Sequence, residues 1–279
     1  MRTIKFVLLL LLFPLIAQSA QIETDYLKIG IDSKGYVISL VSKVDGKEYV
    51  PAGVKSPLMQ LFDGKNYISP ESMTLSGNQI KLSFSNKSVA TIRLDNKKQY
   101  VKLMLVALTN RNNISSIVWG PYSTSIVKYI GETICVVRDD KYAIGMQALN
   151  LNTMDGLPDL LPNTSGGFFI DPLPGQSIPD NLKNLIGTKT NAIEVNKTGD
   201  LPEYIRLWRG TAAFKNKSGS ELRLYSKDWR KGGVSDMEGQ QGYVEPIDVD
   251  FMNSSIAFFG CLEAKTLDLI GTIEQKEGL

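Results

Sequence analysis

The feature that most constrains the fold is a succession of short apolar runs, each bounded by turn-forming residues. Apolar and polar residues that alternate over about four to eight positions are typical of a half-buried β-strand. Many such strands at close spacing indicate a sandwich or a barrel. We therefore predict an all-β fold, a large antiparallel β-sandwich. The predicted strands are 26–31, 36–41, 58–62, 79–84, 89–94, 100–108, 134–137, 142–148, 205–214, 221–225 and 255–262.

Turn signals separate these runs. Asp32-Ser33-Lys34-Gly35 and Asp45-Gly46 are typical of tight turns, in which Gly supplies a positive φ. No window keeps a sustained helical period, so we expect only short helical turns, around Asp180–Ile186. Residues 266–273 are interpreted as a last apolar strand, followed by residues typical of a linker into another domain.

The N-terminus has the three-part pattern of a secretory signal peptide. Arg2 and Lys5 precede an unbroken apolar run, Phe6–Ala17, and Ala17 and Ser19 are small residues at the expected cleavage site. The run is shorter than the roughly 20 residues that a membrane span needs, which disfavours the alternative of an N-terminal anchor. We predict a signal peptide at 1–19, no membrane span, and a protein that is secreted or periplasmic after cleavage.

The rest of the chain, 20–279, is predicted to form a single domain with one Pro/Gly-rich excursion near 151–191. Long excursions of this kind carry functional residues more often than the elements that they connect. A surface insertion without a function is the alternative, and the sequence leaves the two open.

The chain contains no His, and this excludes catalytic triads and the usual zinc sites. Its net charge is +2 and basic residues do not cluster, so we expect no nucleic-acid partner. Cys135 and Cys261 are the two cysteines. A disulfide between them and two buried free thiols are both compatible with the sequence.

Carbohydrate binding by β proteins combines aromatic faces with a few placed polar groups. Trp119-Gly120-Pro121-Tyr122 is interpreted as a turn that displays two rings. Trp208-Arg209 ends an apolar run, and Trp229-Arg230 closes another. A role in the core is the alternative for each ring. The candidate carbohydrate-binding residues are Trp119, Tyr122, Trp208, Arg209, Trp229 and Arg230.

Carboxylate pairs are the usual catalytic groups of glycosidases. Asp139-Asp140 is most simply a solvated turn, and we assign no catalytic residue. Asp248 and Asp250 alternate with apolar residues, which predicts one shared strand face. The acidic stretch 236–250 could hold Ca²⁺ but matches no fixed calcium-loop spacing. We otherwise expect no cofactor.

Several segments resemble the N-terminal galactose-mutarotase-like β-supersandwich domain of large secreted bacterial glycoside hydrolases. They are Leu27–Asp32, Gly35–Leu40, Gly46–Tyr49, Trp119–Tyr122 and Ile134–Asp140. The resemblance implies an accessory sandwich that packs against a catalytic barrel and sometimes contributes loops to its sugar site. Aldose epimerases of this fold use His and Glu, and the absence of His argues against that activity here.

The favoured hypothesis is a non-catalytic carbohydrate-binding or scaffold domain, with a glycan and a catalytic barrel as possible partners. The alternative is a carbohydrate-active hydrolase or lyase that uses Asp/Glu, Tyr and Arg without His. A domain with no ligand is the third hypothesis. The sequence leaves the sugar, the linkage and the oligomeric state undefined.

Overall fold

The computed structural model of the protein describes residues 20–131, 134–156, 158, 168–170, 172, 175–186, 189–190, 205–207, 212–216, 218–231, 233–237, 240–244 and 248–279. The predicted signal peptide, 1–19, lies outside these residues, and so does much of the excursion near 151–191.

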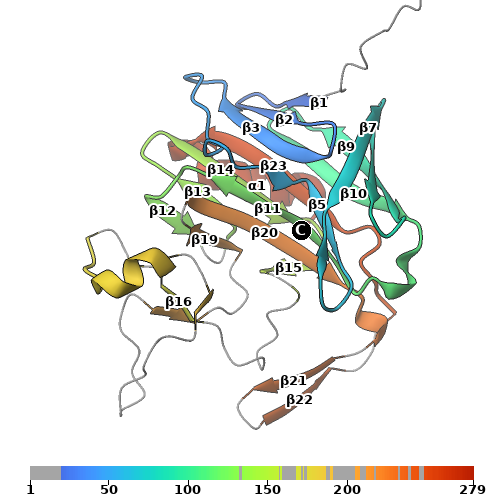
Figure 1. Cartoon of the computed structure of the whole chain (residues 1–279). Coiled ribbons are helices and arrows are strands. Elements are labelled where there is room, and N and C mark those ends of the chain that lie inside the picture. Colours follow the sequence, from blue (N-terminus) through green and yellow to red (C-terminus); the bar gives the residue numbers. More distant parts are fainter. Residues whose placement is uncertain are drawn as a thin grey trace, which may run out of the picture.

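Two large sheets form the body of the molecule (Figure 1). The eight-stranded sheet has the order β12 (Tyr129–Gly131), β13 (Val136–Arg138), β14 (Tyr142–Ala148), β23 (Ser255–Leu262), β10 (Tyr100–Leu108), β9 (Val89–Asn96), β8 (Gln79–Phe84), β7 (Pro70–Ser76). The six-stranded sheet has the order β15 (Thr153–Asp155), β20 (Gly219–Lys227), β11 (Ser116–Thr124), β5 (Met59–Phe62), β6 (Tyr67–Ile68), and β19 (Ala213–Asn216) also pairs with β20.

Three smaller sheets complete the described fold. They comprise β1 (Ala20–Glu23), β2 (Leu27–Ile31), β3 (Tyr36–Ser42) and β4 (Ser56–Pro57); β17 (Lys189–Thr190), β16 (Phe168–Ile170) and β18 (Ile205–Leu207); and the hairpin β21 (Gly233–Met237) and β22 (Gln240–Val244). The hairpin projects away from the two large sheets (Figure 1). Neighbouring strands pair antiparallel in all five sheets, as predicted for an all-β sandwich.

Side chains from both large sheets meet in one apolar core. Alternate residues of a strand point to opposite faces, and in β10 and β23 the core takes Val101, Leu103, Ile256 and Phe258. The intervening residues of these strands, such as Phe259, form a second apolar cluster on the outer face of the eight-stranded sheet. Successive buried side chains of β10 and β23 therefore point alternately into the apolar core and into the second cluster.

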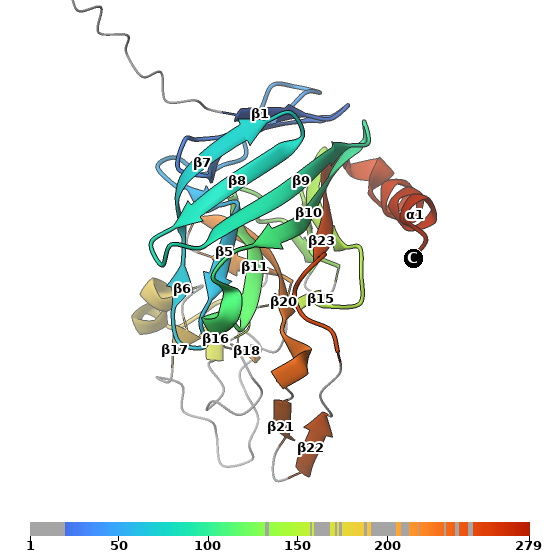
Figure 2. The same cartoon turned by 90° about the vertical axis from the view of Figure 1, so that its right-hand side faces the viewer.

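The second cluster is covered by a helix, and this corrects the prediction of a last strand at 266–273. Residues Thr266–Glu277 form α1, which lies beside β23 on the outside of the sandwich (Figure 2). Leu269 and Ile273 are buried at helical spacing, while Leu267 is exposed. Gly278 ends the helix in a left-handed conformation, with its N–H bonded to the Glu274 carbonyl. The four-residue spacing of Leu269 and Ile273 is that of one helix face. The expectation of no sustained helix was wrong.

Most predicted strands are confirmed, among them 79–84, 100–108, 142–148 and 255–262, and short helical turns occur at Asp180–Leu185 (η2). The prediction of one strand over 205–214 is wrong, because β18 and β19 belong to different sheets. The strand predicted at 134–137 begins later, since Ile134 lies in a turn and Cys135 has a φ of 47°.

Both cysteines are free and buried, so the structure favours the second of the two alternatives for these thiols. Cys135 Sγ lies 3.3 Å from the Ala212 carbonyl oxygen, and Cys261 Sγ lies 3.8 Å from Thr266 Oγ1. Each thiol therefore packs in its own part of the molecule and behaves as a small apolar side chain.

Candidate functional site

The two rings of the Trp119–Tyr122 segment are buried, so the prediction that a turn displays them is wrong. Both residues lie within β11 and face the core. Trp119 Nε1 donates to Ser254 Oγ at 2.8 Å, and the Tyr122 hydroxyl donates to the Leu58 carbonyl at 2.6 Å. A sugar cannot stack on either ring in this conformation.

The Gly-Pro pair that suggested a turn is a bulge inside β11. The pairing of β11 with β20 shifts register between Trp119 and Tyr122. Gly120 has a φ of 88°, and a Cβ there would lie 2.7 Å from Tyr122 N and 2.9 Å from the Leu222 carbonyl oxygen. Only Gly fits this position, because any side chain would collide with backbone atoms. The bulge turns both aromatic residues into the core.

Trp229 and Arg230 lie together at the end of β20, as predicted, in a short 3₁₀ helix. Trp229 is partly buried, Arg230 is exposed, and Lys227 Nζ lies 5.2 Å from the Trp229 ring centroid. Their predicted contact with sugar stays a prediction. Trp208 and Arg209, the other predicted pair, lie outside the described residues.

Arg230 belongs to an ionic network that holds the two ends of the β21–β22 segment together. It donates to both carboxylate oxygens of Asp228 at 2.9 Å, and its Nη2 lies 3.4 Å from Asp250 Oδ2. Arg111 Nη1 donates to the same Asp250 oxygen at 2.8 Å, and the Trp229 N–H donates to the Val249 carbonyl at 2.9 Å. The arrangement is that of a structural clasp.

Asp248 and Asp250 do not lie on a strand, so the prediction of a shared strand face is wrong. Asp250 Oδ1 accepts from the Met252 N–H at 2.8 Å, and its other oxygen faces two guanidinium groups. Within the described ranges, no three Asp, Glu or Cys side chains gather closely enough to hold a metal ion. The Ca²⁺ alternative also involves 238–239 and 245–247, which lie outside those ranges, and stays a prediction.

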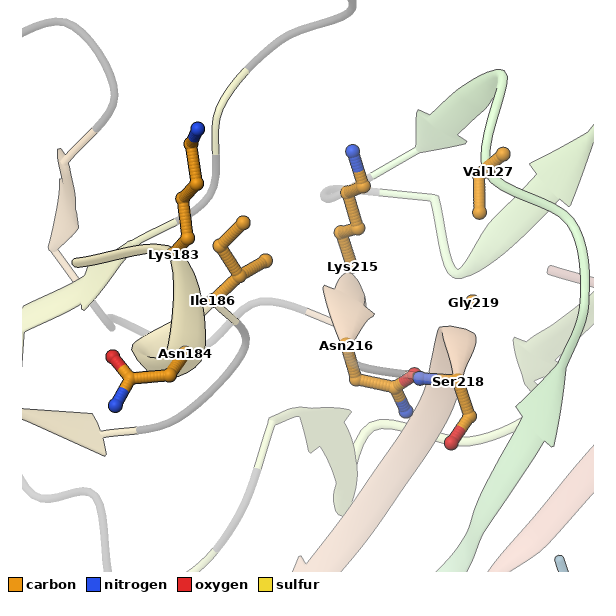
Figure 3. Close-up of a pocket in the computed structure, with 8 residues that line it drawn as sticks. All are labelled: Val127, Lys183, Asn184, Ile186, Lys215, Asn216, Ser218 and Gly219. Carbon is orange, nitrogen blue, oxygen red and sulfur yellow. The ribbon is translucent and has the colours of Figure 1, made fainter. Parts of the chain in front are cut away.

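A pocket of about 560 Å³ lies between η2, β19 and the segment after β11 (Figure 3). Lys183 and Lys215 approach it from η2 and β19, and their side chains point the same way with Ile186 between them. The described residues that line the pocket are Val127, Lys183, Asn184, Ile186, Lys215, Asn216, Ser218 and Gly219. Two ammonium groups, two amides and a hydroxyl therefore surround a space of the size of a small ligand.

The two lysines differ in their surroundings. Lys183 Nζ lies 2.5 Å from Asp180 Oδ1, but that carboxylate is 91% exposed and such a pair contributes little in water. Lys215 makes no ion pair with a described residue. No carboxylate stands among the described lining residues, so the electrostatic character of the pocket is basic.

Asn216, which lines the pocket, holds the turn between β19 and β20 through two side-chain hydrogen bonds. Its Nδ2 donates to Glu221 Oε2 at 3.1 Å, and its Oδ1 accepts from the Ser218 N–H at 2.9 Å. Burial raises the pKa of Glu221, although Arg223 and the Asn216 amide lower it. These bonds hold the β19–β20 turn in one geometry and leave the lysines as the adaptable groups.

Lys183 and Lys215 were not predicted as site residues, because neither stands in a motif. The one relevant signal was the excursion near 151–191, which contains Lys183 and was recognised as a candidate functional loop. Lys215 lies on a separate strand, and its proximity to η2 is a tertiary property that no local pattern records.

The described strands define the class of the protein as an all-β antiparallel sandwich. No protein-family model matches the sequence, and no curated protein matches it either. Among solved structures, a galactose mutarotase related enzyme from Lactobacillus acidophilus is similar, with 12% identity and a TM-score of 0.33; the match covers 87% of this chain and 97% of that chain. A likeness at this level assigns neither an activity nor a ligand. Among the described residues, no helix is long and apolar enough to cross a membrane.

Proposed function

We propose that the protein is a non-catalytic carbohydrate-binding domain, exported and associated with a glycoside hydrolase, and that the pocket in Figure 3 binds an acidic oligosaccharide. The observation that carries the proposal is the pairing of Lys183 and Lys215 across a pocket of about 560 Å³. Ammonium groups donate up to three hydrogen bonds each and attract carboxylate or sulfate groups.

The remaining lining supports a polyhydroxylated ligand. The Ser218 hydroxyl and the Asn184 amide are exposed at the pocket and can donate to and accept from sugar hydroxyls. Val127 and Ile186 supply apolar surface, against which the C–H face of a sugar ring can pack. The predicted signal peptide is consistent with a protein that meets glycans outside the cytoplasm.

The experiment compares binding of an oligogalacturonate and a neutral oligogalactoside of equal length by isothermal titration calorimetry. The acidic ligand is expected to bind at least about tenfold more tightly, since each charge-assisted hydrogen bond contributes about 1.5–3 kcal/mol. The doubly substituted variant Lys183→Gln/Lys215→Gln should lose that preference.

Lys265→Gln is the matched control, because Lys265 forms an i,i+3 pair with Asp268 as Lys183 does with Asp180, but lies outside the pocket. Equal binding of the acidic ligand by the double variant and the control would contradict the proposal. Release of reducing ends from either ligand by the purified protein would instead favour the carbohydrate-active enzyme.

A further inference from the structure

A second cavity, of about 190 Å³, lies beside β20, where β14 runs past the end of β13. The Met146 N–H still bonds to the Cys135 carbonyl, but beyond it the edge of β14 pairs on that side with no described strand. Asp155 from β15 and Glu274 from α1 reach the same opening. The cavity is too small for a drug-sized ligand and large enough for one of a few heavy atoms.

Gln147 lines this cavity, and its side-chain oxygen Oε1 is an acceptor without a described donor. Its Nε2 donates to Glu274 Oε1 at 3.2 Å, and its Oε1 is buried and has no hydrogen-bond partner among the described residues. The opposite amide orientation would direct the oxygen at the Glu274 carboxylate, so Glu274 fixes the orientation. A buried acceptor without a donor costs about 1–3 kcal/mol.

The carboxylate of Asp155 is a second acceptor, and its burial is not offset by a described hydrogen-bond donor or cation. No described residue donates a hydrogen bond to its carboxylate or forms an ion pair with it. Burial raises the pKa of Asp155 to about 6, and no cation of a described residue opposes this effect. A carboxylate in such a place gains strongly from a cationic partner.

The other polar side-chain groups of the cavity are already engaged. The Gln147 amide nitrogen is bound to Glu274, and the Cys135 thiol is directed to the Ala212 carbonyl. The rest of the described lining is apolar: Ile134, Met146, Ala148, Leu224 and Ile270. The site thus combines two carboxylates and an amide with an apolar wall.

We propose that this cavity binds a small organic primary ammonium ion, whose N–H groups bond to the Asp155 carboxylate beside Gln147 and Glu274 and whose apolar body packs against Met146, Leu224 and Ile270. An ammonium group has donors only, which matches the Asp155 carboxylate, an acceptor to which no described residue donates. A hard divalent cation fits less well, because Ca²⁺ takes about six to eight oxygen ligands.

The test uses benzylammonium as the probe and benzyl alcohol as its uncharged isostere, with binding followed by isothermal titration calorimetry at pH 7.5. Benzylammonium is expected to bind at one site, about tenfold or more tightly than benzyl alcohol. Asp155→Asn should weaken benzylammonium binding by about tenfold or more, because the charge partner is lost.

Asp268→Asn is the matched control, since it removes an exposed carboxylate from α1, outside the cavity. Ile270→Trp fills the cavity from the helix and should abolish binding independently of charge. The proposal is overturned if the wild-type protein binds no benzylammonium at about 20 mM, or if benzyl alcohol binds equally well. It is also overturned if both Asp155→Asn and Ile270→Trp bind like the control.

Discussion

The ring of Tyr122 stacks on the ring of Phe258 with centroids 4.8 Å apart and planes inclined by 8°. Tyr122 belongs to the six-stranded sheet and Phe258 to the eight-stranded sheet, so the pair joins the two halves of the sandwich. Both rings are fully buried. Aromatic pairs of this geometry stabilise a core by about 0.5–1.5 kcal/mol beyond the area that they bury.

Tyr122→Ala is therefore expected to reduce the free energy of unfolding by roughly 3–5 kcal/mol, the range for the loss of a buried aromatic side chain. Tyr122→Phe keeps the stack and removes only the hydrogen bond to the Leu58 carbonyl, for about 1–3 kcal/mol. Urea denaturation followed by fluorescence measures both. If Tyr122→Ala folds as stably as the wild type, the position of the ring in the core is wrong.

The strands were predictable because each has a local signature. Runs such as Gln79–Phe84 alternate apolar and polar residues, and this alternation is preserved as burial of every second side chain. Trp119 and Tyr122 could not be placed in the same way. Gly-Pro usually marks a turn, and the bulge that carries it depends on pairing with β20 about a hundred residues later.

The helix α1 provides a second test of packing. Ile273→Ala should destabilise the protein by roughly 2–4 kcal/mol, because Ile273 is fully buried against the outer face of the eight-stranded sheet. Leu267→Ala, on the same helix, should change the free energy of unfolding by less than about 0.5 kcal/mol, since Leu267 is 76% exposed. Similar losses for the two variants would show that α1 does not pack in this orientation.

The two thiols give a prediction that needs no mutation. Burial raises the pKa of both Cys135 and Cys261, so neither forms a reactive thiolate near neutral pH. We expect a thiol reagent such as dithionitrobenzoate to modify neither cysteine in the native protein and both in urea. Unreactive cysteines in urea without a reductant would indicate a disulfide and contradict the free thiols.

Asp155 should make stability depend on pH in a defined window. Its pKa is about 6 in the folded protein against an ordinary value of 3.8, so the folded state binds more protons between these values. Stability relative to Asp155→Asn should therefore fall as pH rises from about 4 to about 6 and stay constant above. Urea denaturation of both proteins from pH 4 to pH 8 measures the difference. A difference that does not vary with pH would show that Asp155 is solvated.

The two candidate sites could not be predicted from the sequence, because each is assembled from several elements of the fold. Lys183 and Lys215 come from different elements, and so do Asp155, Gln147 and Glu274. Each residue type is common on surfaces. Only the folded chain shows that, among the described residues, Lys215 has no ion-pair partner and Gln147 Oε1 has no donor. Trp229 and Arg230 were placed correctly at a strand end, because Asp-Trp-Arg after an apolar strand is itself a local signal.

The clasp at Arg230 and Asp250 makes the base of the projecting hairpin independent of the hairpin's own length. The chain leaves the sandwich at Trp229 and returns at Val249, and these two residues are bonded to each other. A change in the length of the segment between them therefore need not alter the strand pairing of the sandwich. The base of the hairpin is thus closed by bonds that do not involve the hairpin strands themselves.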